Sequence, residues 1–226
     1  MKIILSQTLL FGRVSDLNDI NELYRPIQSP QVGFANWDEA DKLRDEYQQI
    51  SLTKDTKYRM GFDIPAMWGH YASKGTGVCI VFDQDALLAK IPKDCKSKAI
   101  TYRKEINPNL EVVSGVKEKV KINEYNTLFI KSSDWKYEQE YRIIVHSDSS
   151  DRVKLPINDT MMAVIMRDVI DEKQHCQSDK FKMLSKIWDP HLIFDYGNFF
   201  NQSVLRDKDG EEIYPANENL IIDIDI

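Results

Sequence analysis

Charged residues recur at every second position in residues 134–145, whose sequence is DWKYEQEYRIIV. If this segment is extended, the side chains of Glu138, Glu140 and Arg142 project from one face of the strand. Two carboxylates on one face could bind a ribose hydroxyl and stabilise a cationic, oxocarbenium-like centre. The alternative is an edge strand with a solvated charged face, on which Arg142 pairs with one glutamate and discourages aggregation. On residue types alone we favour the solvated edge strand.

Aromatic residues gather in a second segment, PAMWGHYASKGTGVCIVFD, at residues 65–83. On a helix, Trp68, His70 and Tyr71 could stack on a heteroaromatic ring and hydrogen-bond to it. Core packing is the usual explanation for Met67 and Trp68. The Gly-Thr-Gly that follows is too short for a dinucleotide fingerprint or a P-loop, and it precedes a strand where those motifs follow one. We interpret it as a turn.

No recognisable metal or hydrolase motif occurs in the sequence. The four histidines lack H-x-x-x-H and H-E-x-x-H spacing, and the three cysteines include no C-x-x-C pair. The acidic stretch SDLNDINE, at residues 15–22, lacks the glycine and the distal glutamate of an EF-hand loop. A Gly-x-Ser-x-Gly nucleophile elbow is also absent. We therefore expect no metal site, and thiols that stay reduced.

The 226 residues include 30 Lys and Arg and 36 Asp and Glu, for a formal net charge of −6. This acidic balance argues against a general duplex-binding protein, although a local basic groove remains open. No segment approaches the roughly 20 apolar residues that span a bilayer, and the N-terminus lacks the pattern of a signal peptide. We expect a cytoplasmic protein without membrane contact.

Alternating helices and strands must position these residues. Periodicity predicts helices near residue 3 and at 37–49, 66–73, 84–90, 116–131 and 181–188. Strand patterns occupy 8–14, 50–54, 78–82, 99–103, 141–146, 162–167 and 191–196, and the apolar run at 78–82 is typical of a central strand. Because no linker separates two halves, we expect one α+β domain over residues 1–226, with a mixed, split or bent sheet flanked by helices.

Four segments, in this order, resemble a family of uncharacterised bacterial proteins, many of them from defence-island settings. The segments are TLLFGRVSDLNDINE (8–22), ISLT (50–53), AMWGHYASKGTGVCIVFD (66–83) and KSSDWKYEQEYRII (131–144). The combination of MW-x-HY with W-x-YE-x-EYR makes the resemblance specific. It covers about residues 3–170 and leaves a C-terminal extension over about residues 171–226.

That family is similar in turn to a remote form of the ADP-ribosyltransferase fold. The similarity implies NAD as a substrate, Glu140 as the catalytic residue and Glu138 as the residue that orients the acceptor. It also implies NAD contacts for Ser51, Thr53, Trp68, His70, Tyr71 and Arg142. The implied role is a toxin, as in toxin–antitoxin pairs, or an antiviral defence effector with an unknown protein or nucleic acid target. The alternative is a non-catalytic module of the same fold that binds a nucleotide or a protein.

One departure concerns the family's opening strand. The chain begins at MKIILSQTLLF, which matches the helix after that strand, so we expect the first signature strand to be missing. The segment Leu9–Val14 would then expose unpaired backbone groups along an apolar edge. A neutralising partner protein or a second copy of the chain would cover this edge. The alternative is an edge that Arg13 and nearby aspartates keep solvated.

Overall fold

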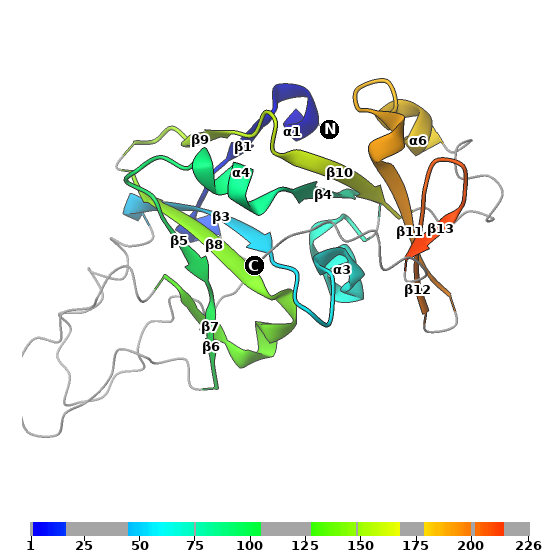
Figure 1. Cartoon of the computed structure of the whole chain (residues 1–226). Helices are drawn as coiled ribbons and strands as arrows, with labels where there is room; N and C mark the ends of the chain where they lie inside the picture. The colour runs from blue at the N-terminus through cyan, green and yellow to red at the C-terminus, as the bar shows by residue number, and fades with distance from the viewer. Residues whose placement is uncertain are drawn as a thin grey trace, which may run out of the picture. The chain divides into compact units, whose positions relative to one another are not determined.

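The structure is a computed structural model of the whole chain (Figure 1). It describes residues 2–16, 45–74, 76–104, 128–147, 149–167, 179–199 and 202–214. The chain forms two compact units: the first comprises Met1–Leu9, Asp55–Ile91 and Leu155–Ile226, and the second comprises Leu10–Lys54 and Pro92–Lys154. The predicted α+β class is confirmed, with several sheets and few helices. The single domain expected over residues 1–226 stays a prediction.

A five-stranded sheet lies at the centre of the first unit, in the order β13-β12-β11-β10-β4. Its strands are β4 (Val78–Phe82), β10 (Met161–Met166), β11 (Ile193–Phe199), β12 (Gln202–Arg206) and β13 (Glu212–Tyr214). The helices of this unit are α1 (Lys2–Ser6), η3 (Gly61–Asp63), α3 (Pro65–Tyr71), α4 (Gln84–Ala89), α6 (Asp179–Leu184) and η6 (Pro190–Leu192). Among the described residues, every helix is too short or too polar to span a bilayer.

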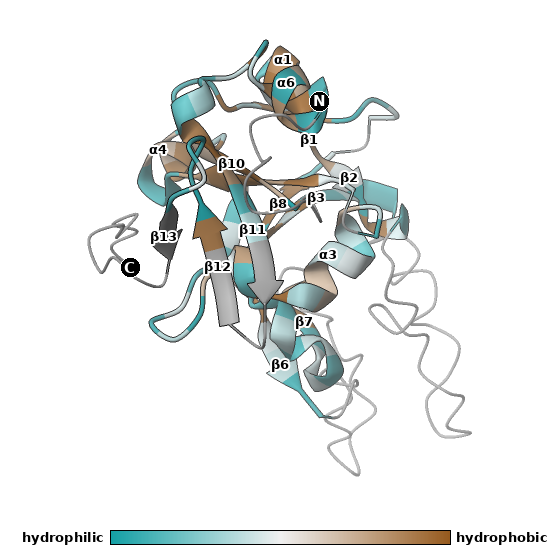
Figure 2. Ribbon diagram, turned by 90° about the vertical axis from the view of Figure 1, so that its right-hand side faces the viewer, coloured by the Kyte–Doolittle hydropathy of each residue, from teal (hydrophilic) through white to brown (hydrophobic). Residues whose placement is uncertain are grey.

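Strand β10, and not β4, occupies the interior of this sheet. It pairs parallel with β11 and antiparallel with β4, and it carries the hydrophobic colouring in Figure 2. The prediction of β4 as a central strand is wrong, because β4 ends the row of described strands and its residues are only half-buried. A run of apolar residues indicates that a strand packs against other elements, which can be helices. It does not require a paired strand on each side.

Successive side chains of β10 pack into cores on opposite faces of the sheet. Val164 and Met166 pack with residues of α1, α6 and β11. Ile165, between them, packs with Phe62 of η3 and Trp68 of α3. Helices therefore cover both faces of this sheet, as the alternation of side chains along a buried strand requires.

Two predicted helices of the first unit are present with small shifts at their ends: 66–73 corresponds to α3 (Pro65–Tyr71), and 84–90 corresponds to α4 (Gln84–Ala89). Pro65 occupies the first turn of α3, where its missing N–H leaves no hydrogen bond unmade. Asp83 caps α4, because its Oδ1 accepts a hydrogen bond of 2.7 Å from the backbone N–H of Ala86.

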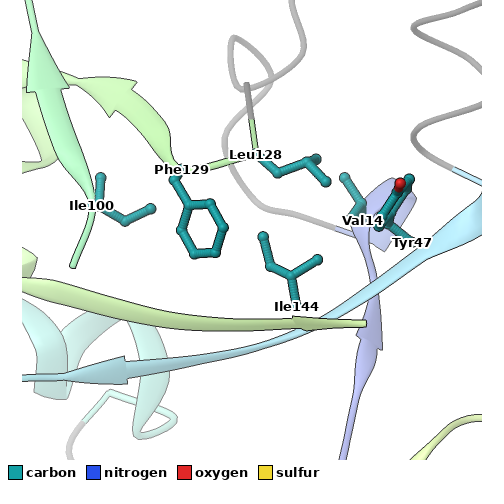
Figure 3. Packing of buried hydrophobic residues seen from close by; sticks show 6 residues of the cluster. All are labelled: Val14, Tyr47, Ile100, Leu128, Phe129 and Ile144. Carbon is teal, nitrogen blue, oxygen red and sulfur yellow. The ribbon is translucent and has the colours of Figure 1, made fainter. Parts of the chain in front are cut away.

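An antiparallel sheet in the order β2-β3-β8-β5 organises the second unit. The elements of this unit are β2 (Gly12–Arg13), η1 (Val14–Asp16), β3 (Tyr47–Thr53), β5 (Lys96–Ala99), β6 (Thr101–Arg103), β7 (Ile130–Ser132), η4 (Ser133–Glu138) and β8 (Glu140–His146). The core against this sheet comprises Val14, Tyr47, Ile100, Leu128, Phe129 and Ile144 (Figure 3). A separate parallel pair, β6 with β7, lies beside η4 in contact with it. Strand β8 is thus an interior strand of its sheet.

The segment expected to form an unpaired edge finds partners within the chain. Strand β1 (Thr8–Leu10) pairs with β9 (Lys154–Pro156), and β2 pairs with β3. Between these strands, the N–H of Phe11 donates to the carbonyl of Val153 at 3.0 Å, and the Phe11 side chain is buried. The expected open apolar edge at Leu9–Val14 is therefore wrong. A partner protein or homodimer stays a prediction.

Two predicted helices also differ from the structure. Residues 47–49, at the end of the helix predicted over 37–49, belong to β3, and residues 130–131, at the end of the helix predicted over 116–131, belong to β7. The remaining residues of these predictions lie outside the described residues, except for two helical residues at 45–46 and a turn at 128–129. Pairing with another strand outweighs helical spacing here, because β3 and β7 each gain a ladder of hydrogen bonds with a distant segment.

We expect opposite effects of alanine at two glycines of the first unit. A Cβ on Gly77 would lie 2.9 Å from the Cα of Ala72, so Gly77→Ala should overpack the turn before β4 and lower the free energy of unfolding by about 1–3 kcal/mol. A Cβ on Gly69 would meet no atom within 4 Å, so Gly69→Ala should raise it by roughly 0.5–1 kcal/mol through helix propensity. Urea denaturation measures both. Equal effects would contradict this account of the turn.

Candidate functional site

Four charged side chains form a buried cluster in the second unit. Their exposed fractions are 7% for Lys131, 3% for Glu138, 4% for Glu140 and 1% for Arg142. They come from three consecutive elements: Lys131 from β7, Glu138 from η4, and the other two from β8. Two acids and two bases balance, so the four side chains carry no formal net charge when all are ionised.

Lys131 bridges the two carboxylates. Its Nζ lies 2.7 Å from Oε2 of Glu138 and 3.2 Å from Oε2 of Glu140. On the other side of Glu140, Nε and Nη2 of Arg142 each lie 2.7 Å from Oε1. The Nη1 of Arg142 donates to the carbonyl of Leu128 at 2.6 Å. Each buried charge therefore faces an opposite charge at hydrogen-bond distance, which is the condition for keeping charges out of water.

A turn, and not strand alternation, brings Glu138 into the cluster. Residues 133–138 form η4, and the backbone N–H of Asp134 in its first turn donates to the hydroxyl of Ser132 at 3.3 Å. Gln139 then adopts a left-handed conformation, with φ 50° and ψ 44°, and β8 begins at Glu140. The prediction that Glu138, Glu140 and Arg142 lie on one strand is therefore wrong for Glu138. Ser132 is a good cap residue, and that local preference outweighs the alternating pattern of the sequence.

The solvated edge strand that residue types favour is also wrong. Strand β8 lies between β3 and β5, and both Glu140 and Arg142 are buried. The error has a physical reason, because an arginine alone cannot neutralise two glutamates. The second cation, Lys131, comes from β7, outside the segment in which the alternation appears.

The surroundings of Glu140 favour its ionised form. Burial raises the pKa of Glu140, but the Arg142 guanidinium, the Lys131 ammonium and a hydrogen bond from Ser51 together hold this pKa below its usual range. The carboxylate is therefore negatively charged at neutral pH.

Tyr102 of β6 faces the same cluster. Its hydroxyl oxygen accepts a hydrogen bond of 2.8 Å from the backbone N–H of Glu140. Burial raises the pKa of Tyr102 to about 12, and the nearby Glu138 and Glu140 carboxylates act in the same direction. The phenol therefore keeps its proton at neutral pH.

The second unit contains five of the eight residues to which the sequence assigns a catalytic or NAD-binding role. The register of β3 and β8 places Thr53 opposite Glu140 and Ser51 opposite Arg142. Glu138 joins them through its shared contact with Lys131. Ser51 is exposed and Thr53 is half-buried, and the Ser51 hydroxyl hydrogen-bonds to the Glu140 carboxylate on the neighbouring strand.

The other three, Trp68, His70 and Tyr71, belong to α3 in the first unit. Trp68 is buried, its indole N–H donates to the carbonyl of Phe62 at 2.7 Å, and its ring stacks on Tyr196 with centroids 5.7 Å apart. The core-packing interpretation of Trp68 is thus confirmed. His70 and Tyr71 are exposed, and their contact with a ligand stays a prediction.

Sequence reasoning missed Lys131 and Tyr102. Lys131 falls at the end of a predicted helix, and nothing in its neighbourhood signals a buried ammonium. A pair of glutamates with one local arginine does signal a missing cation, and this imbalance could have prompted a search for a lysine. No group of three or more His, Cys, Asp or Glu able to hold a metal ion occurs within the described ranges of the chain.

Residues 67–143 match a family model described as "Protein of unknown function (DUF2971)". The matched segment begins in α3, includes the W-x-YE-x-EYR motif and ends in β8. Neither the curated proteins nor the solved structures gave a match. Over about a third of its length, the chain is therefore similar to an uncharacterised family.

The substitution Lys131→Met should strongly destabilise the protein. It leaves two buried glutamates with one cation, and we expect the free energy of unfolding to fall by about 3–5 kcal/mol. The matched control is Lys136→Met in η4, where the side chain is exposed and the change should stay within about 0.5 kcal/mol. Urea denaturation at neutral pH compares the two variants. Similar losses of unfolding free energy in the two variants would mean that the Lys131 bridge contributes little to stability.

The same bridge predicts how stability depends on pH. The folded-state pKa of Glu140 is lowered, so its contribution is present above the unfolded value of about 4.3 and is lost as pH falls through the folded value. The wild type should therefore keep this contribution down to about pH 5. In Lys131→Met, protonation of one glutamate relieves the repulsion, so the deficit relative to wild type should shrink between about pH 7.5 and about pH 5. A stability deficit that stays constant over this pH range would contradict repulsion between the two glutamates in Lys131→Met.

Proposed function

We propose that this chain is an ADP-ribosyltransferase-like enzyme that uses NAD to modify a macromolecule, as a toxin or defence effector. The observation that carries the proposal is the placement of Ser51 and Thr53 on β3 beside Glu140 on β8. These are residues through which the sequence resembles that fold, and the register sets Thr53 opposite Glu140. Segments almost ninety residues apart in the sequence thus supply adjacent groups.

In this proposal, NAD supplies an ADP-ribosyl group on a labile bond between C1′ of the ribose and the nicotinamide nitrogen. Glu140 accepts a hydrogen bond from the ribose and stabilises positive charge that develops at C1′. Arg142 and Lys131 keep the Glu140 carboxylate ionised and hold its orientation. Ser51 and Thr53 contact the dinucleotide, and Glu138 orients the acceptor group of the target.

A non-catalytic module that binds a nucleotide or a protein is the second candidate, and the ion pairs of Glu140 favour it. The Glu140 carboxylate is 4% exposed, and its charge is offset by Arg142 and by the shared Lys131. A carboxylate paired in this way exerts a weaker field on a developing cation than an unpaired one. For this candidate, the cluster is a structural polar core, and Glu140 has no chemical role.

Substitution of each glutamate by glutamine separates the two candidates. Both side chains are buried and both contact Lys131, but Glu140 also pairs with Arg142, so the stability of Glu138→Gln and of Glu140→Gln is measured separately. We expect Glu140→Gln to abolish both the release of nicotinamide from NAD and the growth inhibition of expressing cells, because the negative charge is lost. Glu138→Gln should keep nicotinamide release and lose transfer to the target.

Nicotinamide release by the purified proteins is the direct measurement, with circular dichroism as the control for folding. Glu140→Asp, which keeps the charge but retracts the carboxylate, covers the case in which Glu140→Gln does not fold. Equal release by the wild type and a folded Glu140 variant would contradict a Glu140-dependent enzyme. Binding of NAD without release by the wild type would establish the binding module instead.

A further inference from the structure

Gln49 of β3 is linked to Glu140 through the hydroxyl of Ser51. Gln49 is buried, with an exposed fraction of 4%, and its Nε2 donates to the hydroxyl oxygen of Ser51 at 3.1 Å. The Ser51 hydroxyl in turn hydrogen-bonds to the Glu140 carboxylate across the β3–β8 pair. A side chain to which the sequence assigns no role therefore reaches the charged cluster by a contact at each step.

The pairing of β3 with β8 places these three side chains on one face of the sheet. The register sets Gln49 opposite Ile144 and Ser51 opposite Arg142. Residues two apart on a strand project to the same face, and so do residues paired directly across two strands. Gln49 and Glu140 are buried whereas Ser51 is exposed. An exposed serine hydroxyl can rotate and donate to water, so a neighbour is needed to hold it against the carboxylate.

The chemistry of the three groups fixes the direction of both hydrogen bonds. An ionised carboxylate can only accept, so the single proton of the Ser51 hydroxyl points to Glu140. The Ser51 oxygen is then left as an acceptor, which the amide N–H of Gln49 fills. A hydroxyl group that accepts a hydrogen bond also donates a stronger one. Both bonds therefore run toward the negative charge of Glu140.

The neighbouring Gln48 has the contacts of a structural glutamine, and Gln49 does not. Gln48 is 1% exposed, its Nε2 donates to the carbonyl of Asp151 at 2.9 Å, and its Oε1 accepts from the N–H of Val153 at 2.9 Å. Both ends of the Gln48 amide thus tie β3 to another backbone segment. The Oε1 of Gln49 is buried without a partner in the described part of the chain, so the bond to Ser51 is the contribution of its amide there.

We propose that Gln49 is a positioning residue, which holds the Ser51 hydroxyl in the orientation that donates to Glu140. Its consequence for catalysis rests on the proposed function, in which the Glu140 carboxylate must face a developing positive charge in one orientation. Gln49 acts through Ser51 and contacts neither the substrate nor the reacting atoms.

The charge of Glu140 has several sources, and the experiment isolates the one that Gln49 controls. The titratable and charged groups around Glu140 come from every adjacent element: Arg142 of β8, Lys131 of β7, Glu138 of η4, Tyr102 of β6, and Lys98 of β5, which pairs opposite Arg142. All of these groups are kept when Gln49 is replaced, so a change in the titration of Glu140 reports the Ser51 hydroxyl.

The titration of the Glu140 carboxyl group tests the link without any substrate. NMR of protein labelled with carbon-13 at the glutamate carboxyl carbons gives the titration midpoint, and Glu140→Gln assigns the signal. Gln49→Met and Ser51→Ala should each raise this midpoint by about 0.5–1 pH unit, because the ionised form loses a hydrogen bond. The double variant should show no more than one of these shifts, since Gln49 acts through Ser51.

Two control variants separate positioning from a purely structural role. Gln48→Met removes a buried amide of the same size from the same strand, so it should lower stability and leave the Glu140 midpoint unchanged. Ser51→Thr keeps a hydroxyl group and should keep the wild-type midpoint. In the proposed reaction, the acid limb of kcat/KM for nicotinamide release should move in Gln49→Met by the same amount as the NMR midpoint.

An unchanged Glu140 midpoint in Gln49→Met would overturn the inference, and so would shifts that add in the double variant. Gln49→Leu covers the case in which Gln49→Met does not fold, and failure of both variants to fold would assign Gln49 to folding alone. A moved NMR midpoint with an unmoved acid limb would overturn the consequence for catalysis. A wild type that neither cleaves nor binds NAD would overturn the proposed function, while the NMR titration still decides whether Gln49 positions Ser51.

Discussion

The ammonium of Lys131 between Glu138 and Glu140 is the interaction on which the candidate site depends. Two carboxylates this close in a buried environment would repel each other and drive one of them to bind a proton. A lysine placed 2.7 Å from one and 3.2 Å from the other turns that repulsion into attraction. The bridge also ties β7, η4 and β8 together, because each contributes one member of the contact.

The other contacts of Glu140 complete the cluster around this bridge. With one oxygen of Glu140 on Lys131, the other faces Arg142, and the backbone N–H of Glu140 donates to Tyr102. All these groups hold one carboxylate in a single orientation, which is the arrangement needed when a charge must act at a defined point.

The two conspicuous motifs have different physical roles. In MW-x-HY, Trp68 packs in a core of the first unit, where it stacks on Tyr196 and anchors α3 to the sheet. In W-x-YE-x-EYR, the two glutamates and the arginine are buried and form ion pairs. Residues that look equally prominent in the sequence thus contribute to apolar packing in one motif and to ion pairs in the other.

The sequence by itself determined features that depend on near neighbours. The helices predicted at 66–73 and 84–90 and the strand predicted at 78–82 depend on side chains within a few residues of one another. Examples are the Asp83 cap of α4 and Pro65 in the first turn of α3. The spacing of the acidic pair and Arg142 also singled these residues out, although residue types alone favoured a solvated edge strand. The interactions that stabilise each of these elements join residues close together in the sequence, so the local sequence pattern is enough to predict the element.

Only the tertiary structure decided which distant segments meet. It placed β8 inside its sheet, joined residues 47–49 to a strand and brought Lys131 to both glutamates. The physical reason is that strand pairing and charge compensation depend on groups far apart in the chain, and a window of neighbouring residues contains only one partner of each such contact.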